Sequence, residues 1–324
     1  MAAIRHVKHF ALAVVLLSAL GQPAAAFPDR PIKLVVPFPA GGATDTAARL
    51  VARGMSAKLG QTILIENQGG AGGTIATRQV VAAPPDGYTL IAVGVSSTFA
   101  TMEMLFKIDY EPIKALAPVG LTTIDPAVLV VHPDVPAQTI EDLVRYAKAN
   151  PGKLNYGSSI GIGPHFVMEL FKRSAGLDIV HVPYRGGGPM ITDLLAGQVQ
   201  MTVNGKSVLL PHLESGKLRA LAVAGPKRWP ELPNVPTFIE TGYLKETYDS
   251  VFGIAAPAGT PQPIIEQLNQ AINEGMAMPD VKAGLAKLGI EPNPHSVQEF
   301  ADYIASEAPR WREIVRITGI KMKQ

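Results

Sequence analysis

The chain has 324 residues, among them 28 prolines, 31 glycines and no cysteine. Without cysteine there can be no disulfide framework, zinc–thiolate site, iron–sulfur cluster or cysteine nucleophile. Charged residues make up 17% and hydrophobic residues 47% of the chain, which excludes a disordered or acidic-tail protein. At about 150 residues per domain, the length predicts two domains.

The amino terminus has the pattern of a secretory signal peptide. Arg5 and Lys8 precede an apolar run over residues 10–20, and three alanines end at Ala26. The run is too short for a membrane anchor, which needs about 20 residues. We therefore predict a signal peptide over residues 1–26 that is cleaved after Ala26, and a mature protein in the periplasm.

The charge of the mature chain disfavours nucleic acid as a partner. The predicted leader contains two of the 29 basic residues and none of the 27 acidic ones, so 27 of each remain and the formal net charge is zero. No basic run is left that could follow a phosphate backbone. We expect a monomer that binds a small molecule.

Short β-rich runs alternate with helical patterns, which predicts an α/β fold. The first strand, 32–36, leads through a loop over 37–45 into apolar residues at helical spacing, with Gly60 at the helix end. A strand at 154–156 leads in the same way through a glycine-rich loop over 157–164. Each unit would aim a helix amino terminus, with its free N–H groups, at one spot. This is an anion site built twice.

The remaining elements follow the same signals. Pro189 is placed as the first residue of a helix that Gly197 closes, and Ser296 with Glu299 forms a capping box. Thr139 is expected to cap a further helix. Other strands are predicted at 62–66, 88–94, 128–131, 179–182, 199–203, 218–223 and 251–255.

The second loop also contains an enzyme-like pattern. Residues 157–161 read Gly-Ser-Ser-Ile-Gly and match the G-x-S-x-G nucleophile elbow of α/β-hydrolases. Ser159 with Asp249 and His295 would follow the hydrolase order of a catalytic triad. However, two glycines and Pro164 delay the helix, and no HGGG-type oxyanion segment precedes it. We therefore expect no enzyme activity and keep the serine hydrolase as an alternative.

Cofactor and metal patterns are weak. Residues 205–207 end like a P-loop, but Gln200 stands where its first glycine is needed. The mature histidines lack the spacing of metal ligands, so we expect neither a metal nor a cofactor. His165 lies in the second loop, where it could touch a ligand or serve only packing.

Eight segments resemble, in order and over the whole mature length, the Bug family of periplasmic solute-binding receptors of tripartite tricarboxylate transporters. They are RPI (30–32), VVPFPAGGATD (35–45), GAGGT (70–74), PDGYTL (85–90), NYGSS (155–159), HVPYRG (181–186), LRALAV (218–223) and APAGTP (256–261).

The resemblance implies a type II periplasmic-binding-protein fold, in which two α/β lobes are joined by two crossover strands around a ligand cleft. Lobe 1 would comprise 27–125 and 252–295, lobe 2 would comprise 126–251, and 296–324 would form a C-terminal helix region. The hinge is expected near 123–127 and 247–253.

The family grips a carboxylate with backbone N–H groups of the two corners. By resemblance, the ligand-binding residues are Phe38, Ala40, Gly41, Gly42, Ala43, Thr44, Asp45, Ser96, Ser158, Ser159, Gly161, His165, Tyr184 and Asn204. Asn204 replaces a frequent aspartate and Lys206 a small or apolar residue, which leaves open whether either faces the cleft.

The implied function is capture of a small carboxylate for the membrane subunits of a transporter. A receptor that presents its closed form to a signalling protein would share the same sequence signature. Backbone amides recognise a carboxylate and not the rest of the molecule, so the sequence does not identify the ligand.

Overall fold

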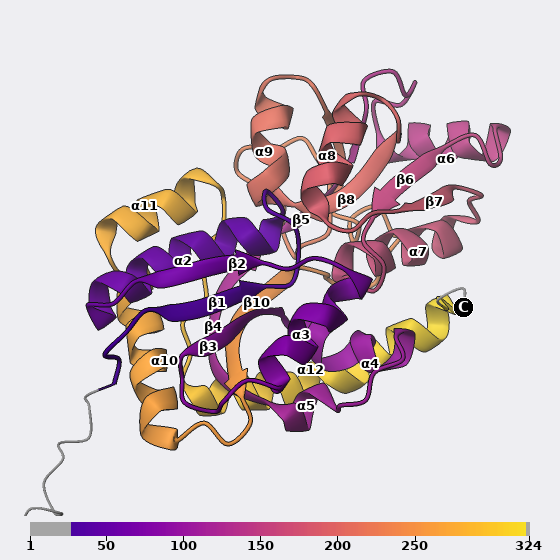
Figure 1. The fold of residues 1–324 in the computed structure, drawn as a ribbon. Helices are drawn as coiled ribbons and strands as arrows, with labels where there is room; N and C mark the ends of the chain where they lie inside the picture. Colours follow the sequence, from indigo (N-terminus) through magenta and orange to yellow (C-terminus); the bar gives the residue numbers. More distant parts are fainter. Residues whose placement is uncertain (1–26, 322–324) are drawn as a thin grey trace, which may run out of the picture.

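The computed structural model describes residues 27–321, and the predicted signal peptide lies outside them. Two sheets, each flanked by helices, form an upper and a lower lobe in Figure 1. The predicted α/β class with two lobes is confirmed. Among residues 27–321, no helix combines the length and hydropathy needed to cross a bilayer.

The first lobe is built on a six-stranded sheet in the order β11-β4-β10-β3-β1-β2. β1 pairs in parallel with β2 and β3, whereas β10 runs antiparallel to β3 and β4. The strands are β1 (Ile32–Val36), β2 (Ile63–Asn67), β3 (Thr89–Gly94), β4 (Leu116–Asp125), β10 (Ser250–Pro257) and β11 (Glu291–Pro292).

Helices bury both faces of this sheet. Alternate residues of a strand point to opposite sides, so each strand contributes side chains to both faces. Leu34 and Leu90 pack on one face, under α2 (Ala43–Leu59) and α10 (Gln262–Met276). Val35 and Ile91 pack on the other, against α3 (Thr74–Val81) and α12 (Val297–Thr318). Shorter helices are η1 (Ala71–Gly73), η2 (Ser97–Thr101), α4 (Met102–Leu105), α5 (Pro112–Ala115) and α11 (Pro279–Lys287).

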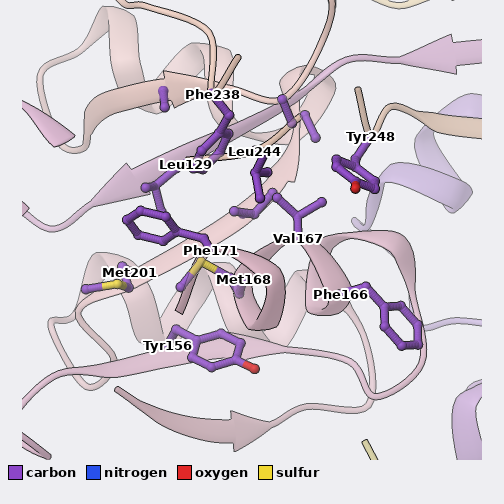
Figure 2. Close-up of a cluster of buried hydrophobic side chains, with 14 of the residues drawn as sticks. Leu129, Tyr156, Phe166, Val167, Met168, Phe171, Met201, Phe238, Leu244 and Tyr248 are labelled. Carbon is purple, nitrogen blue, oxygen red and sulfur yellow. The ribbon is translucent and has the colours of Figure 1, made fainter. Parts of the chain in front are cut away.

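The second lobe is built on a five-stranded sheet in the order β7-β6-β8-β5-β9. α6 and α7 cover the face that carries Leu129 and Tyr156, part of which is shown in Figure 2. α8 and α9 cover the face that carries Val128 and Val130. The elements are β5 (Ala127–Val131), α6 (Ile140–Ala149), β6 (Asn155–Ser158), α7 (Gly163–Ala175), β7 (Val180–Pro183), α8 (Gly187–Leu195), β8 (Met201–Gly205), α9 (Lys206–Glu214) and β9 (Arg219–Val223).

The chain crosses from one sheet to the other twice, and its last helix, α12, packs on both lobes. Only Pro126 separates β4 from β5, and the segment 224–249 leads from β9 back to β10. Phe300 of α12 packs in the first lobe, whereas Trp311 packs with the core of the second. The last helix therefore touches both lobes, as its course below α7 in Figure 1 shows.

Short-range sequence signals predicted the ends of several helices correctly. The capping boxes at Thr139 and Ser296 are present, and Gly60 ends α2 in the left-handed conformation with φ of 66°. The prediction that Pro189 opens α8 is wrong, because the helix begins two residues earlier at Gly187. Proline is still tolerated there, since it lies in the first turn, where N–H groups lack partners within the helix.

A fully buried and a half-buried carboxyl group lie at the two crossovers. Asp125, fully buried at the end of β4, accepts hydrogen bonds from the backbone N–H and the hydroxyl of Ser207. Burial raises the pKa of Asp125 to about 7, against these hydrogen bonds, and the charge of Asp249 raises it further. Burial also raises the pKa of Asp249, which precedes β10, to about 6.

The raised pKa of Asp125 predicts a pH-dependent stability. An aspartate in the unfolded chain has a pKa of about 3.9. Between about pH 4 and 7, Asp125 therefore holds a proton in the folded protein that it has lost in the unfolded chain. The contribution of Asp125 to the free energy of unfolding therefore falls as pH rises through this window.

We expect Asp125→Asn to gain stability relative to the wild type between pH 4 and 7, by on the order of 2 kcal/mol. Urea denaturation at several pH values measures the difference. A difference that stays constant across the window would contradict the assignment.

Candidate functional site

A cavity lies between the two lobes, where β1, β3, β6 and β8 end. It leaves about 60 Å³ open to the centres of water molecules, enough for several waters or a small organic molecule. Its lining consists of Phe38, Gly42, Ala43, Thr44, Gly94, Ser96, Ser97, Ser158, Ser159, Ile162, Gly163, Pro164, Gly186, Gly187, Met190, Val203, Asn204, Ser250, Val251 and Phe252.

The amino terminus of α2 opens into this cavity. Gly42 is the N-cap residue, and within residues 27–321 no side chain caps the helix there. The first N–H groups of a helix have no carbonyl partner inside it, and they carry the positive end of the helix dipole. Gly42, Ala43 and Thr44 therefore offer backbone donors to whatever fills the cavity.

Asp45 does not line the cavity, although it belongs to the same loop. Its carboxylate accepts hydrogen bonds from Gly41 N–H at 3.0 Å, Arg49 Nε at 3.0 Å and Asn67 Nδ2 at 2.8 Å. Burial alone would raise its pKa, but the bonds from Arg49, Asn67 and Gly41 together lower it. Asn67 also donates to the Phe38 carbonyl at 3.1 Å. Asp45 thus anchors the loop from behind.

The second corner, at α7, offers serine hydroxyls in addition to backbone groups. Ser158 and Ser159 line the cavity, but Pro164 has no N–H to give. The Gly161 N–H donates to His165 Nδ1 at 3.2 Å, and neither residue lines the cavity. Burial lowers the pKa of His165 to about 3, so its ring is neutral. His165 therefore supports the loop.

The lobes touch at the mouth of the cavity through glycine. A Cβ built on Gly188 of α8 would lie 2.6 Å from the Ala40 carbonyl oxygen, and one on Gly187 would lie 3.3 Å from Gly42 Cα. Contacts below 3.0 Å are not tolerated by a rigid backbone. The two loops can therefore approach this closely only without side chains at these positions.

None of the described residues that line the cavity has a charged side chain. Lys206 is buried elsewhere, with its ammonium 2.7 Å from Glu231 Oε2 and 5.0 Å from the ring centre of Trp229. Asn204 does line the cavity. Its Oδ1 accepts from the Gly205 N–H at 2.8 Å, which leaves the side-chain NH₂ for other partners.

Of the fourteen residues assigned by resemblance, eight line the cavity: Phe38, Gly42, Ala43, Thr44, Ser96, Ser158, Ser159 and Asn204. Ala40, Gly41 and Asp45 of the first loop, Gly161 of the second loop and His165 of α7 do not line the cavity. Tyr184 is also off the lining and donates its hydroxyl to Asp193 at 2.6 Å.

The sequence reasoning missed Ser97 after β3, Gly186 and Gly187 at the start of α8, and the strand β10. In the glycine-rich segment 183–189 only Tyr184 was assigned a role, whereas Gly186 and Gly187 are the residues that line the cavity. The rule that ligands bind beyond the carboxyl ends of parallel strands would have added Ser97, which follows β3.

The elements of a hydrolase triad are not assembled. In the described structure, no hydrogen bond joins Ser159 to Asp249 or His295. Asp249 lies at the second crossover, and the half-buried His295 precedes α12.

Comparison with known proteins identifies the family. Residues 47–320 match the TctC family, the tripartite tricarboxylate transporter family receptor. Protein BugT of Bordetella pertussis is 36% identical over 299 residues, covering 92% of this chain and 92% of BugT. The chain is thus a periplasmic-type solute-binding receptor, and it belongs to the TctC family, which includes the Bug proteins.

Two solved structures with ligands share the fold. R. palustris Rpa4515 with adipate is 36% identical, with a TM-score of 0.87 over 91% of this chain and 100% of that one. MatC from Rhodopseudomonas palustris with bound malate is 35% identical, with a TM-score of 0.84 over 89% of this chain and all of MatC.

Proposed function

We propose that this protein captures a small carboxylate in the interlobe cavity and delivers it to the membrane subunits of a tripartite tricarboxylate transporter. The observation that carries the proposal is the uncapped amino terminus of α2, which opens into a cavity whose described lining has no negative charge. The adipate and malate of the two structural relatives support the same ligand class.

The donors suit an anion with two acceptor oxygens. Hydrogen bonds to a charged group contribute about 1.5–3 kcal/mol each. The amides at Gly42 to Thr44 come from one lobe, and the hydroxyls of Ser158 and Ser159 with the amide of Asn204 come from the other. A carboxylate between them would be held without a cationic side chain.

Closure of the lobes would couple capture to delivery. Contacts from both lobes stabilise only the closed form, so ligand shifts the population toward it. We assign the hinge to 123–127 and 247–253, with lobe 1 over 27–125 and 252–295 and lobe 2 over 126–251. Family membership favours the transporter over a signalling protein as the partner, and a monomer suffices for both.

Export would precede capture. We expect cleavage between Ala26 and Phe27, because the apolar run and the three alanines match a leader and its processing site. Intact-mass measurement of periplasmic protein should give a chain that begins at Phe27. A full-length, membrane-bound species would contradict this prediction.

A panel of carboxylic acids tests the proposed ligand class. At least one of malate, adipate, succinate and benzoate should raise the thermal unfolding midpoint by several degrees, because a ligand at 100 times its Kd adds about 2.7 kcal/mol. Differential scanning fluorimetry measures the shift. If none of the four acids raises the midpoint, the proposed function is wrong.

The variant Gly188→Ala tests whether ligand binding closes the lobes. Alanine suits a helix better than glycine, so the ligand-free variant should be at least as stable as the wild type. The new Cβ would press on the Ala40 carbonyl only when the lobes are closed. We expect less than half of the wild-type shift, and a full shift would contradict the closure mechanism.

The amide of Gly42 can be tested by a pair of variants. Gly42→Pro removes the N–H, and Gly42 has φ of −87°, close to what proline adopts. Gly42→Ala keeps the N–H, and its Cβ would meet Gly187 N at an ordinary 3.5 Å. Calorimetric titration with the best acid of the panel should show at least a tenfold loss for proline, about 1.4 kcal/mol, and little loss for alanine.

Circular dichroism confirms that both variants fold. Arg185→Ala serves as a further comparison, because Arg185 is exposed and does not line the cavity. Normal binding by Gly42→Pro, together with lost binding by Arg185→Ala, would show that a side-chain cation holds the ligand instead.

A further inference from the structure

His181 contacts a cavity-lining residue from behind. Its Nε2 lies 2.9 Å from the Ser158 hydroxyl oxygen and 3.2 Å from the Ser158 carbonyl oxygen. The parallel register of β6 and β7 pairs His181 with Tyr156, two residues before Ser158. Ser158 is buried and lines the cavity, whereas His181 does not line it.

The His181 ring is held in place by two other rings. It stacks on His165 with centroids 4.2 Å apart and on Tyr156 with centroids 4.7 Å apart. Tyr156 is itself fixed, because its hydroxyl donates to Glu169 at 2.5 Å, and Lys172 binds the same Glu169 oxygen at 2.6 Å. The direction in which Nε2 points is therefore set by packing.

The carbonyl contact favours one placement of the proton. A carbonyl oxygen can only accept, so the Nε2 that lies 3.2 Å from it is better matched as N–H than as a lone pair. Burial lowers the pKa of His181, so the ring is neutral and has one N–H, at Nε2. That N–H is shared between the carbonyl and the hydroxyl oxygen of Ser158.

The consequence falls on the Ser158 hydroxyl. A hydroxyl has one proton to donate and can accept at its oxygen. When the oxygen accepts from His181, the hydroxyl proton is free for a partner on the cavity side. With the opposite tautomer, the hydroxyl would donate to the histidine and present only lone pairs to an anion.

We propose that His181 is a positioning residue, which orients the Ser158 hydroxyl as a hydrogen-bond donor to the carboxylate of the ligand. This inference rests on the proposed function, and it gives the second corner a donor where Gly161 and Pro164 supply none. It also assigns a role to the histidine of the segment 181–186.

The first test observes the tautomer without any ligand. Long-range ¹H–¹⁵N correlation spectra of the wild-type protein at neutral pH should show His181 protonated at Nε2 and unprotonated at Nδ1. A spectrum with the proton on Nδ1 would overturn the proposal, whether or not any acid binds.

The second test measures affinity in variants. The titrant is the acid among malate, adipate, succinate and benzoate that binds the wild type best. His181→Phe keeps the ring stack and removes the donor, and we expect about a tenfold loss of affinity, as for Ser158→Ala. His181→Gln places an amide N–H near the position of Nε2 and should restore most of the affinity.

The double variant separates positioning from a structural effect. In the Ser158→Ala background, His181→Phe should cause no further loss, because the hydroxyl that it orients is absent. Wild-type affinity in His181→Phe, or an undiminished loss in the Ser158→Ala background, would overturn the proposal. If the wild type binds none of the four acids, the proposed function fails instead, and the spectra still decide the tautomer.

Discussion

The site depends on keeping the amino terminus of α2 free of the chain's own carboxylate. Asp45 lies in the first turn, where an aspartate can satisfy the free N–H groups of a helix and compete with a ligand. Here it accepts instead from Gly41, Arg49 and Asn67, and its oxygens are occupied on the side away from the cavity. The same Asn67 also holds the Phe38 carbonyl, so one buried cluster both diverts the competing charge and shapes the loop.

The two sheets position the loops that face each other across the cavity. Each sheet is buried on both faces, which fixes the register of its strands and hence the positions where they end. β1 and β6 end at the two corners, and the absence of a side chain at Gly188 lets α8 approach the Ala40 carbonyl in the loop before α2. α12 packs on both cores, so the lobes share apolar contacts in addition to the two crossovers.

The sequence predicted what local rules govern. The helix cap at Thr139, the capping box at Ser296, the terminal Gly60 and both strand–loop–helix corners follow from short-range hydrogen bonding and backbone conformation. It could not tell which loop residues face the cavity, because Asp45 and Tyr184 are turned away by distant partners, Asn67 in one case and the next helix in the other. The cavity residues of β10 were missed because this strand, Ser250–Pro257, is far in the sequence from the loop that precedes α2.

The corners also differ in chemistry, and this difference bears on closure. With the lobes apart, a ligand could contact the donors of one lobe only, so the donors of the other lobe supply the affinity that distinguishes closed from open. Moving a two-state equilibrium from 1:99 to 99:1 takes about 5.5 kcal/mol of differential binding. At about 1.5–3 kcal/mol for each hydrogen bond to a charged group, about two to four donors are needed. Ser158, Ser159 and Asn204 supply that number, and because they are hydroxyls and an amide, their strength depends on how neighbours such as His181 orient them.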